Sequence, residues 1–216
     1  MSKRKSKIKI IWTTNFAYAI GLITTDGNLS NDGRHILYTT KDEQLAITYK
    51  KCLDITNKIG KKSRGFGKEK KYYVIQFGDI NFYEFLITIG ITPRKSKTLI
   101  QIQIPNKYFA DFLRGCIDGD GTISISDHPE SQYKQLKIRL SSASPLFLQW
   151  IGEKIALLIK TKGGHIYTDK TKSVSTLSYA KADGGKILKC MYYKKDLPCL
   201  KRKEKIAKKW ASGAIG

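Results

Sequence analysis

Two segments that end in Asp-Gly constrain this chain more than any other feature of its sequence. Ala19–Gly27 reads AIGLITTDG and Leu113–Gly121 reads LRGCIDGDG, so each predicts an apolar, small-residue helix that runs into Asp26 or Asp120. An acidic residue is unfavourable there, because the carbonyl groups at a helix C-terminus carry partial negative charge. One such ending needs only the turn chemistry of aspartate. Two such endings at matching places indicate an internal repeat in which each half supplies one carboxylate. Binding of a divalent metal is the best explanation for an aspartate at both helix ends.

The elements expected around these segments follow one order in both halves of the chain. Periodicity, capping and turn residues predict helices over 15–25, 42–60 and 79–89 in the first half, with strand pairs around 29–38 and 61–77. The second half predicts helices over 105–120, 145–159 and 185–194, strand pairs around 122–141 and 165–179, and a basic tail at 201–209. The order α-β-β-α-β-β-α thus occurs twice and predicts an α+β fold of two half-domains, residues 1–104 and 105–216. Their short connection predicts one monomeric pseudo-dimer.

A glycine lies at the same place in both Asp-ending helices, at Gly21 and Gly115. Small residues allow two helix backbones to approach closely, so we expect the helices to lie side by side with these glycines facing each other. That arrangement delivers Asp26 and Asp120 to adjacent points at one end. Two adjacent carboxylates repel each other unless a cation lies with them. Hard oxygen ligands favour Mg²⁺, completed by water and phosphate oxygens, so Mg²⁺ is the expected cofactor.

The balance of charge predicts a polyanionic partner. The 216-residue chain carries 40 Lys and Arg against 18 Asp and Glu, a formal net charge of +22, and such an excess opposes compaction by self-repulsion. Nucleic acid fits this charge, and a membrane surface is the competing interpretation. The sequence shows no apolar run long enough to span a bilayer and no signal-peptide pattern, so an intracellular protein is expected. The basic segment at residues 3–7 is interpreted as a phosphate-seeking arm.

The two motifs, the element order and the basic closing segment resemble the LAGLIDADG homing endonuclease family in its single-chain, two-motif form. The resemblance covers nearly the whole chain and implies two antiparallel sheets that form a pseudo-twofold saddle over double-stranded DNA, with the motif helices as the central seam. It implies a site-specific, Mg²⁺-dependent endonuclease, encoded within an intron, in whose metal site Mn²⁺ or Ca²⁺ can also bind. Such an enzyme hydrolyses both strands of a long asymmetric target across the minor groove and leaves 3′ overhangs.

The resemblance also implies roles for individual residues. The metal-binding acid of each motif falls on Asp26 and Asp120, and the residues before them, Thr25 and Gly119, can lend a backbone carbonyl to the metal. Thr24 departs from the family word, which has aspartate there, at a position that is not a metal ligand in the family. The basic residues of the active site fall on Lys41, Lys203 and one of Lys95 and Lys97, between which the sequence does not choose.

Strand alternation assigns a DNA-reading face, if helices cover the other face of each sheet. Arg139 and Lys137 suit guanine edges in the major groove, and Gln76 suits adenine. Because the two halves differ, the expected target is not palindromic. The side chains expected on this face are Asn28, Ser30, His35, Thr39, Tyr72 and Gln76 in the first half, and Thr122, Ser124, Ser126, Lys137, Arg139, Ser141, Thr176 and Ser178 in the second.

Two further classes of function compete with a nuclease. The first is a protein that kept the fold and does not cut, such as an RNA-splicing maturase or a DNA-binding regulator. Retention of both motif acids favours the enzyme, because a binding protein gains nothing from two carboxylates beside phosphate. The second is a basic protein of a membrane surface or a ribosome, which requires a lysine-rich amphipathic helix. Only residues 201–210 approach that pattern.

Overall fold

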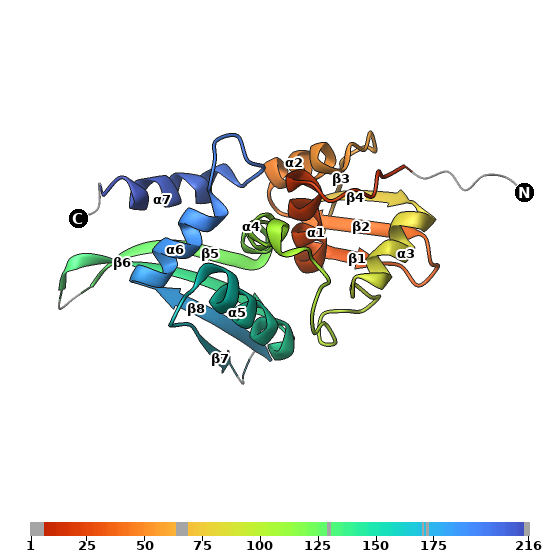
Figure 1. Cartoon of the computed structure of the whole chain (residues 1–216). Coiled ribbons are helices and arrows are strands. Elements are labelled where there is room, and N and C mark those ends of the chain that lie inside the picture. The colour runs from red at the N-terminus through yellow and green to blue at the C-terminus, as the bar shows by residue number, and fades with distance from the viewer. Residues whose placement is uncertain (1–6, 64–68, 129–130, 170, 172, 214–216) are drawn as a thin grey trace, which may run out of the picture.

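The chain folds into two similar α/β halves on either side of a central pair of helices (Figure 1). The computed structural model describes residues 7–63, 69–128, 131–169, 171 and 173–213. These residues contain seven α-helices and two four-stranded antiparallel sheets, so the predicted α+β class and the repeated order of elements are confirmed. Within the described residues, no helix has the length and apolar character needed to cross a bilayer.

The two halves use the same order of helices and strands. The first half contains α1 (Thr14–Asp26), β1 (Gly27–Leu29), β2 (His35–Thr40), α2 (Glu43–Leu53), β3 (Gly60–Lys62), β4 (Tyr72–Gly78) and α3 (Ile80–Thr88). The second contains the 3-10 turn η1 (Asn106–Tyr108), α4 (Phe109–Asp120), β5 (Gly121–His128), β6 (Ser131–Ser142), α5 (Pro145–Ile159), β7 (His165–Asp169), β8 (Val174–Ala180) and α6 (Lys181–Met191), followed by α7 (Lys201–Ala211). The strand orders β1-β2-β4-β3 and β5-β6-β8-β7 match position for position.

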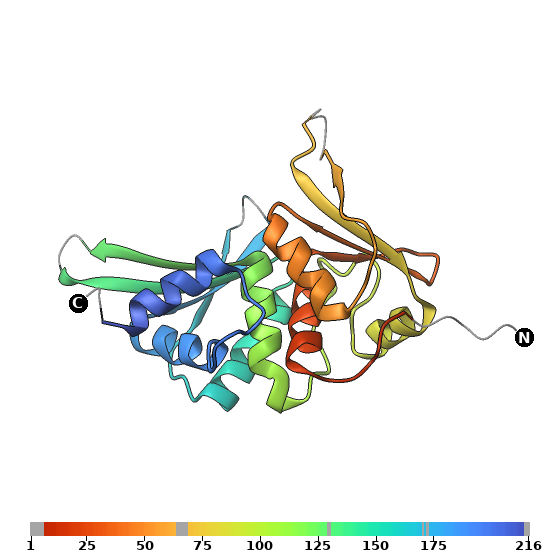
Figure 2. The same ribbon diagram turned by 90° about the horizontal axis from the view of Figure 1, so that it is seen from above.

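Helices α1 and α4 meet through their backbones at the two predicted glycines. A Cβ built on Gly21 would lie 2.3 Å from the carbonyl oxygen of Phe112, and one built on Gly115 would lie 2.2 Å from that of Tyr18. Neither position has room for a methyl group, so the prediction that the glycines face each other is confirmed. Figure 2 shows the two helices side by side between the two sheets.

The glycine after each motif aspartate also serves close approach. Gly27 and Gly121 have φ angles of −84° and −97°, so neither uses the left-handed conformation that often ends a helix at glycine. A Cβ on Gly27 would lie 2.5 Å from the carbonyl oxygen of Ile23, and one on Gly121 would lie 2.7 Å from that of Ile117. The absence of a side chain at these glycines therefore lets the backbone of each half turn directly from its helix into the first strand of its sheet.

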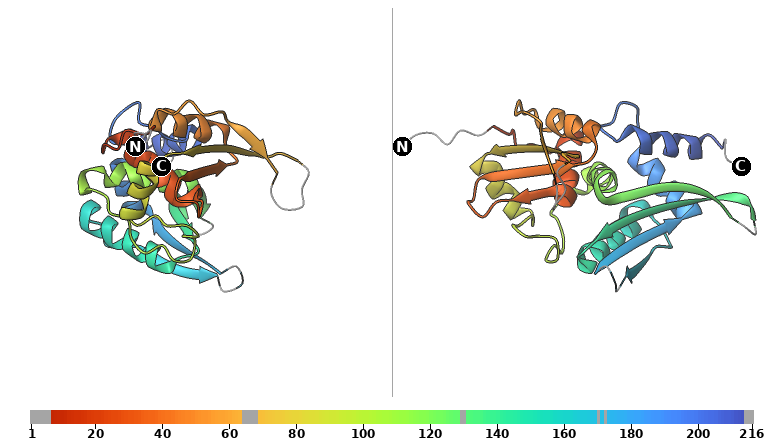
Figure 3. Two further views of the ribbon diagram at one scale, coloured as in Figure 1. Left: turned by 90° about the vertical axis from the view of Figure 1, so that its right-hand side faces the viewer. Right: turned by 180° about the vertical axis from the view of Figure 1, so that it is seen from behind.

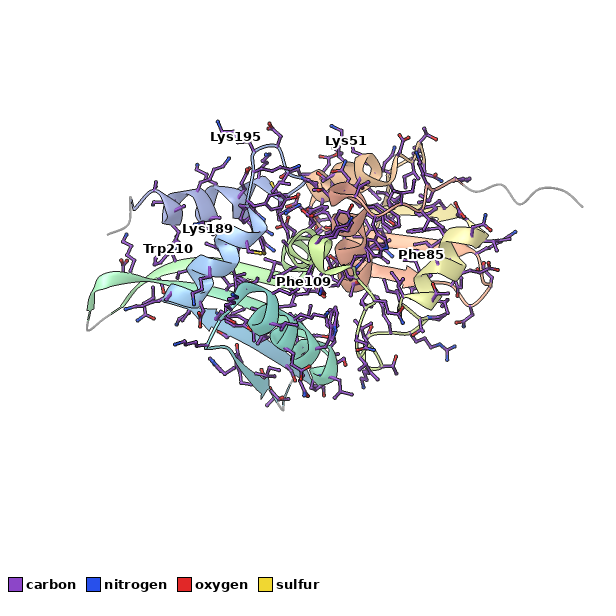
Figure 4. The ribbon with its side chains drawn as sticks, viewed as in Figure 1. Lys51, Phe85, Phe109, Lys189, Lys195 and Trp210 are labelled. Atoms are coloured by element: carbon purple, nitrogen blue, oxygen red, sulfur yellow. The ribbon has the colours of Figure 1, made fainter. Side chains whose placement is uncertain are left out.

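One face of each sheet packs on the central helices and forms the core. In the first sheet, Ile36, Tyr38, Ile75 and Phe77 are at most 2% exposed, as expected for strands whose alternate residues point to one covered face. Aromatic rings add to the core of both halves: Phe85 packs 5.9 Å from Trp12 and Phe109 packs 6.3 Å from Trp150, measured between ring centroids. Figure 4 labels Phe85 and Phe109.

Several predicted boundaries were wrong. Helix α2 ends at Leu53, well before Gly60, because Asp54 adopts the left-handed conformation with φ 52° and stops the helix. The predicted helix over 105–120 begins as the 3-10 turn η1, since Pro105 fits that turn. Helix α6 starts at Lys181, before the predicted residue 185, which lets Asp183 in its first turn accept backbone hydrogen bonds from Lys162 and Gly163.

Other predicted segments lie partly or wholly outside the described residues. These are most of the basic segment at residues 3–7, the end of the strand expected from residue 61, and the turn at 128–130. The basic tail at 201–209, in contrast, forms most of α7. Its residue Trp210 reaches α6, where a Cβ on Gly185 would lie 3.4 Å from the indole Nε1 (Figure 4).

The glycine contact predicts a specific loss of stability. Gly115→Ala should lower the free energy of unfolding by roughly 1–3 kcal/mol, because the added methyl group overpacks a backbone contact. Gly152→Ala is the matched control, since it also lies in a helix but its Cβ would meet no atom closer than 3.8 Å. That control should gain about 0.5–1 kcal/mol from helix propensity. Urea unfolding measures both, and equal midpoints for the two variants would contradict the packing.

Candidate functional site

The C-terminal ends of α1 and α4 bring the two motif segments together. The Oδ2 atom of Asp26 lies 3.1 Å from the position that a Cβ of Gly119 would take, and Thr25 Oγ1 lies 2.1 Å from it. The residue after Gly119 is Asp120, so both motif aspartates lie at the same end of the helix pair. Asp26 is half-buried and Asp120 is exposed, which leaves this end of the helix pair open to a ligand.

Two buried lysines donate hydrogen bonds to equivalent backbone carbonyl groups in the two halves. Lys95, which follows α3, donates a hydrogen bond of 2.6 Å from its Nζ to the carbonyl oxygen of Gly27. Lys203, in the first turn of α7, donates to the carbonyl oxygen of Gly121 at 2.7 Å and also to those of Ile117 and Asp118. Each ammonium group therefore binds the glycine that directly follows a motif aspartate, and the pseudo-twofold repeat extends to these lysines.

Burial and nearby carboxylates act in opposite directions on these ammonium groups. Burial lowers the pKa of Lys95 to about 8, although the negative charges of Asp120 and Asp26 oppose this change. Burial likewise lowers the pKa of Lys203 to about 8, opposed mainly by Asp118 and further by Asp120 and Asp26. Since each lysine interacts with both motif aspartates, four charged groups share one small region at the end of the helix pair.

Asp118 connects the second motif to the segment that carries Lys203. Its Oδ2 atom accepts hydrogen bonds from the hydroxyl of Tyr18 at 2.8 Å and from the backbone N–H of Leu200 at 2.7 Å. Burial raises the pKa of this carboxyl group, while Lys203 and the two hydrogen bonds oppose the change. The first motif has Thr24 here, whose hydroxyl donates to the carbonyl of Ile20 within its own helix. The difference between the motifs therefore reflects a structural task of Asp118.

A buried arginine fixes the same C-terminal segment from the other side. Arg114 is 0% exposed and donates to the carbonyl oxygens of Met191 at 2.6 Å and Pro198 at 2.8 Å. Its remaining nitrogen forms a 2.7 Å ion pair with Asp111, which also accepts a hydrogen bond from Tyr193 at 3.2 Å. Because the guanidinium group binds both ends of the connection between α6 and α7, it helps to position Lys203.

An open hollow of about 820 Å³ lies beside Asp26 and is lined largely by residues of the first half. Its lining includes Lys95 and the predicted Lys41, whose ammonium group lies 5.4 Å from the centre of the Tyr72 ring. Two basic residues that were not predicted, Lys62 and Arg202, line it as well. The sequence signals that could have revealed them are the alternation of strand β3 and the position next to Lys203. Lys97, the alternative to Lys95, is exposed and does not line the hollow.

Strand register places most of the predicted DNA-reading residues on one open face of each sheet. In the first sheet Asn28 pairs with Leu37, which pairs with Gln76, so these three share a face. In the second, Thr122 pairs with Arg139, which pairs with Ser178. The view in Figure 3, right, is from the side of this face. By the same registers the face also carries His35, Thr39, Tyr72, Ser124, Ser126, Lys137, Ser141 and Thr176.

A few of these residues are less accessible for contact with DNA than the strand alternation suggested. Thr176 and Ser178 are each 8% exposed, because they lie on β8, an inner strand between β6 and β7. Ser30 lies just beyond β1, where its carbonyl oxygen accepts a hydrogen bond from Tyr83 at 2.7 Å. His35 is on the open face, but its Nδ1 atom is already engaged by Asp32. Alternation alone could not reveal these local contacts.

The oxygen groups at the end of the helix pair fit a hard divalent cation. They are the carboxylates of Asp26 and Asp120 and, as the motif implies, the backbone carbonyls of the preceding residues Thr25 and Gly119, an all-oxygen set of the kind that Mg²⁺ prefers. Gly119 has no side chain to crowd the Asp26 carboxylate. Within the described ranges no cluster of three or more His, Cys, Asp or Glu residues forms, so water and substrate oxygens would have to complete the coordination of an ion held here.

The sequence matches no protein-family model and no curated protein sequence. The structure, however, resembles mesophilic variants of the homing endonuclease I-DmoI, at 15% identity over 89% of this chain and 96% of that chain, with a TM-score of 0.58. The meganuclease I-SmaMI bound to uncleavable DNA matches at 14% identity over 94% and 91%, with a TM-score of 0.57. The N-terminal LAGLIDADG domain of DUF199/WhiA matches at 14% identity over 91% and 89%, with a TM-score of 0.56.

These comparisons establish the fold of the chain. Each covers about nine-tenths of both structures, so the whole chain, with both halves, adopts the LAGLIDADG fold, and the prediction of this fold is confirmed. Structures described as endonucleases share the fold with a domain of WhiA. Whether this chain cuts DNA is therefore a question about its site.

The buried arginine generates a second stability prediction. Arg114→Met should cost about 3–5 kcal/mol, because it leaves the Asp111 carboxylate buried without its ion-pair partner. The double variant Arg114→Met/Asp111→Leu should recover much of that loss, since an apolar pair of similar volume can replace a buried ion pair. Denaturant unfolding measures both variants. A single variant as stable as the wild-type chain would show that the guanidinium group does not hold the C-terminal segment.

Proposed function

We propose that this protein is a site-specific, metal-dependent endonuclease that cuts both strands of a long, asymmetric DNA duplex. The observation that carries the proposal is the convergence of Asp26 and Asp120 with two buried lysines at one end of a helix pair. The uncovered, largely polar sheet faces on either side and the net charge of +22 support a DNA duplex as the partner. DNA-bound endonucleases of the same fold, such as I-SmaMI, support the same substrate class.

The residues at the helix ends divide the chemistry between them. Asp26 and Asp120, with the backbone carbonyls of Thr25 and Gly119, would hold Mg²⁺, in a site that Mn²⁺ or Ca²⁺ could also occupy. A divalent ion in such a site makes water a better nucleophile and stabilises charge on the leaving oxygen. Two carboxylates fit this task, because one could serve each strand of a duplex seated across the helix ends. The product would carry 3′ overhangs if the cuts fall across the minor groove.

The lysines place positive charge where a scissile phosphate would lie. Lys95 and Lys203 are anchored on the carbonyls of Gly27 and Gly121, so their ammonium groups are already oriented before a substrate binds. Preorganised charge of this kind stabilises a transition state without the cost of ordering the donor. Lys41, over the ring of Tyr72, would contact DNA from the first sheet. The arrangement within one chain supports action as a monomer, consistent with an intron-encoded enzyme.

The competing function is sequence-specific binding without cleavage, as a DNA-binding regulator or an RNA-splicing maturase. The structural similarity to the LAGLIDADG domain of WhiA supports binding without cleavage as the second candidate function. The two motif acids argue against it, because carboxylates near a phosphate backbone weaken binding unless a cation offsets them. Incubation of a supercoiled plasmid library with and without Mg²⁺ separates the two candidates. Discrete Mg²⁺-dependent cuts support the enzyme, and tight binding without cuts supports the regulator.

Replacement of either motif acid should separate binding from cutting. Asp26→Asn or Asp120→Asn is expected to abolish double-strand cleavage while duplex affinity stays within roughly tenfold, since metal ligands serve the chemistry more than docking. Single-turnover cleavage and a gel-shift titration measure the two quantities. Full cleavage by either variant would refute the assignment of that carboxylate.

The two lysines that the sequence could not separate give a further test. Lys95→Met should slow cleavage by about 10²–10³-fold, the usual cost of losing one preorganised donor. It should change the melting temperature little, because methionine fills the buried volume and the removal of a buried charge offsets the loss of the hydrogen bond to Gly27. Lys97→Met changes an exposed side chain and should weaken binding by at most one phosphate contact, with an unchanged rate at saturating enzyme. Equal rates for the two variants would remove Lys95 from the site.

A further inference from the structure

The two sheets differ at one pair of equivalent positions, where one has an apolar side chain and the other a charged one. Tyr38 pairs with Gly27, the residue after the first motif aspartate, and Leu140 pairs with Gly121, the residue after the second. One residue earlier on the same strands stand Leu37 and Arg139. Both lie on the open face of their sheet, on the strand next to the one that leaves the motif. Equivalent positions over the two halves of a duplex thus present an alkyl group on one side and a guanidinium group on the other.

Leu37 is part of an apolar patch that alternation did not reveal. Its strand neighbour Thr39 pairs with Val74, so Val74 is the diagonal neighbour of Leu37 on the same face. Both side chains are half-buried and not fully covered, and Leu37 lines the hollow beside Asp26. Scattered surface leucines are ordinary, but here two neighbouring aliphatic side chains beside the site remain partly exposed on the open face. The corresponding residue for Val74 in the second sheet is Thr176.

The polar side chains around the patch complete a recognition pattern. Asn28 and Gln76 pair with Leu37 from either side and are both exposed. Amide side chains of this kind make paired hydrogen bonds with adenine, and alkyl groups contact the methyl group of thymine. An alkyl group flanked by two amides therefore fits A·T pairs.

The second sheet presents a different pattern around Arg139. Its neighbours Thr122 and Ser178 are short, and Lys137 lies on the same face. The Nε atom of Arg139 is buried and has no hydrogen-bond partner within the described residues. Because only Nε is buried without a partner, the guanidinium group can present its terminal nitrogens to the O6 and N7 atoms of guanine, the commonest specific contact in the major groove.

We propose that Leu37 and Val74 read thymine methyl groups in the target half-site under the first sheet, while Arg139 reads guanine at the equivalent place in the other half-site. This pair of positions then determines in which direction the protein binds its asymmetric target. A·T pairs lie under β2, and a G·C pair lies under β6. The inference rests on the proposed recognition of duplex DNA, and it assigns base identities which that proposal leaves open.

Selection from a random duplex library in EDTA, where a metal-dependent nuclease cannot cut, tests the assignment. The wild-type chain should recover one sequence with A·T pairs in one half-site and a guanine in the other. Leu37→Arg should change one selected base from thymine to guanine in the first half-site only. Arg139→Leu should make the reverse change in the second half-site only. Both side chains lie on an open face, so circular dichroism should show that both variants fold.

Uracil isolates the methyl contact without any change to the protein. Replacing the assigned thymine by uracil removes one methyl group and should weaken wild-type binding by about fourfold. The sequence selected by Leu37→Arg has guanine at that position, so uracil should weaken its binding only at the thymine assigned to Val74. Val74→Ser, which removes both methyl groups of the side chain, should reduce the sensitivity to uracil at one further position.

The outcomes separate this inference from the function on which it rests. A selected sequence whose wild-type affinity is unaffected by uracil throughout the first half-site would overturn the assignment of Leu37 and Val74. So would an unchanged base preference in Leu37→Arg. Failure of the wild-type chain to recover any common sequence would overturn sequence-specific recognition itself, and the inference with it.

Discussion

The contact between the backbones of α1 and α4 is the constraint on which the rest of the structure depends. Gly21 and Gly115 allow the two helices to approach until a carbonyl oxygen of each lies where a side chain would otherwise stand. At that separation the helices cannot slide or splay independently. Their C-terminal ends therefore meet, and the two motif segments share one region. The sheets follow, because each first strand leaves its helix directly at Gly27 or Gly121.

The same contact explains why lysines are buried beside the carboxylates. A helix end offers several carbonyl groups without partners in its own helix, and two helix ends side by side concentrate them. Lys95 and Lys203 satisfy carbonyls at these ends and bring positive charge to a place that already holds Asp26 and Asp120. The region thus combines anionic and cationic groups, which is the combination that the proposed metal and phosphate contacts require.

Sequence patterns predicted the repeated architecture because its signals are local. The Asp-Gly endings, the facing glycines and the alternation in β5 and β6 each depend on a few neighbouring residues. The positions of Lys95 and Lys203 relative to the helix ends depend on segments distant in the chain, so residue patterns alone could not choose Lys95 over Lys97. The roles of Arg114 and Asp118 were equally hidden, because a buried ion pair and a buried carboxylate look like ordinary charged residues in a sequence.

The open sheet faces show a second limit of pattern reading. Alternation assigned polar residues to the open face and passed over Leu37 and Val74, since apolar residues on a strand normally point to the core. Strand register corrects this, because Leu37 pairs with Asn28 and Gln76. The two halves therefore agree in backbone and differ in the chemistry of their exposed faces, as expected when a repeat keeps its fold and each copy contacts different bases.

A shared cation centre between Asp26 and Asp120 is tested most directly by anomalous diffraction from crystals of the chain bound to duplex DNA in Mn²⁺. We expect anomalous density within ligand distance of carboxylate oxygens from both residues, with Lys95 and Lys203 on their glycine carbonyls. Density at neither carboxylate, or at one while the other points away from the helix seam, would contradict the central claim.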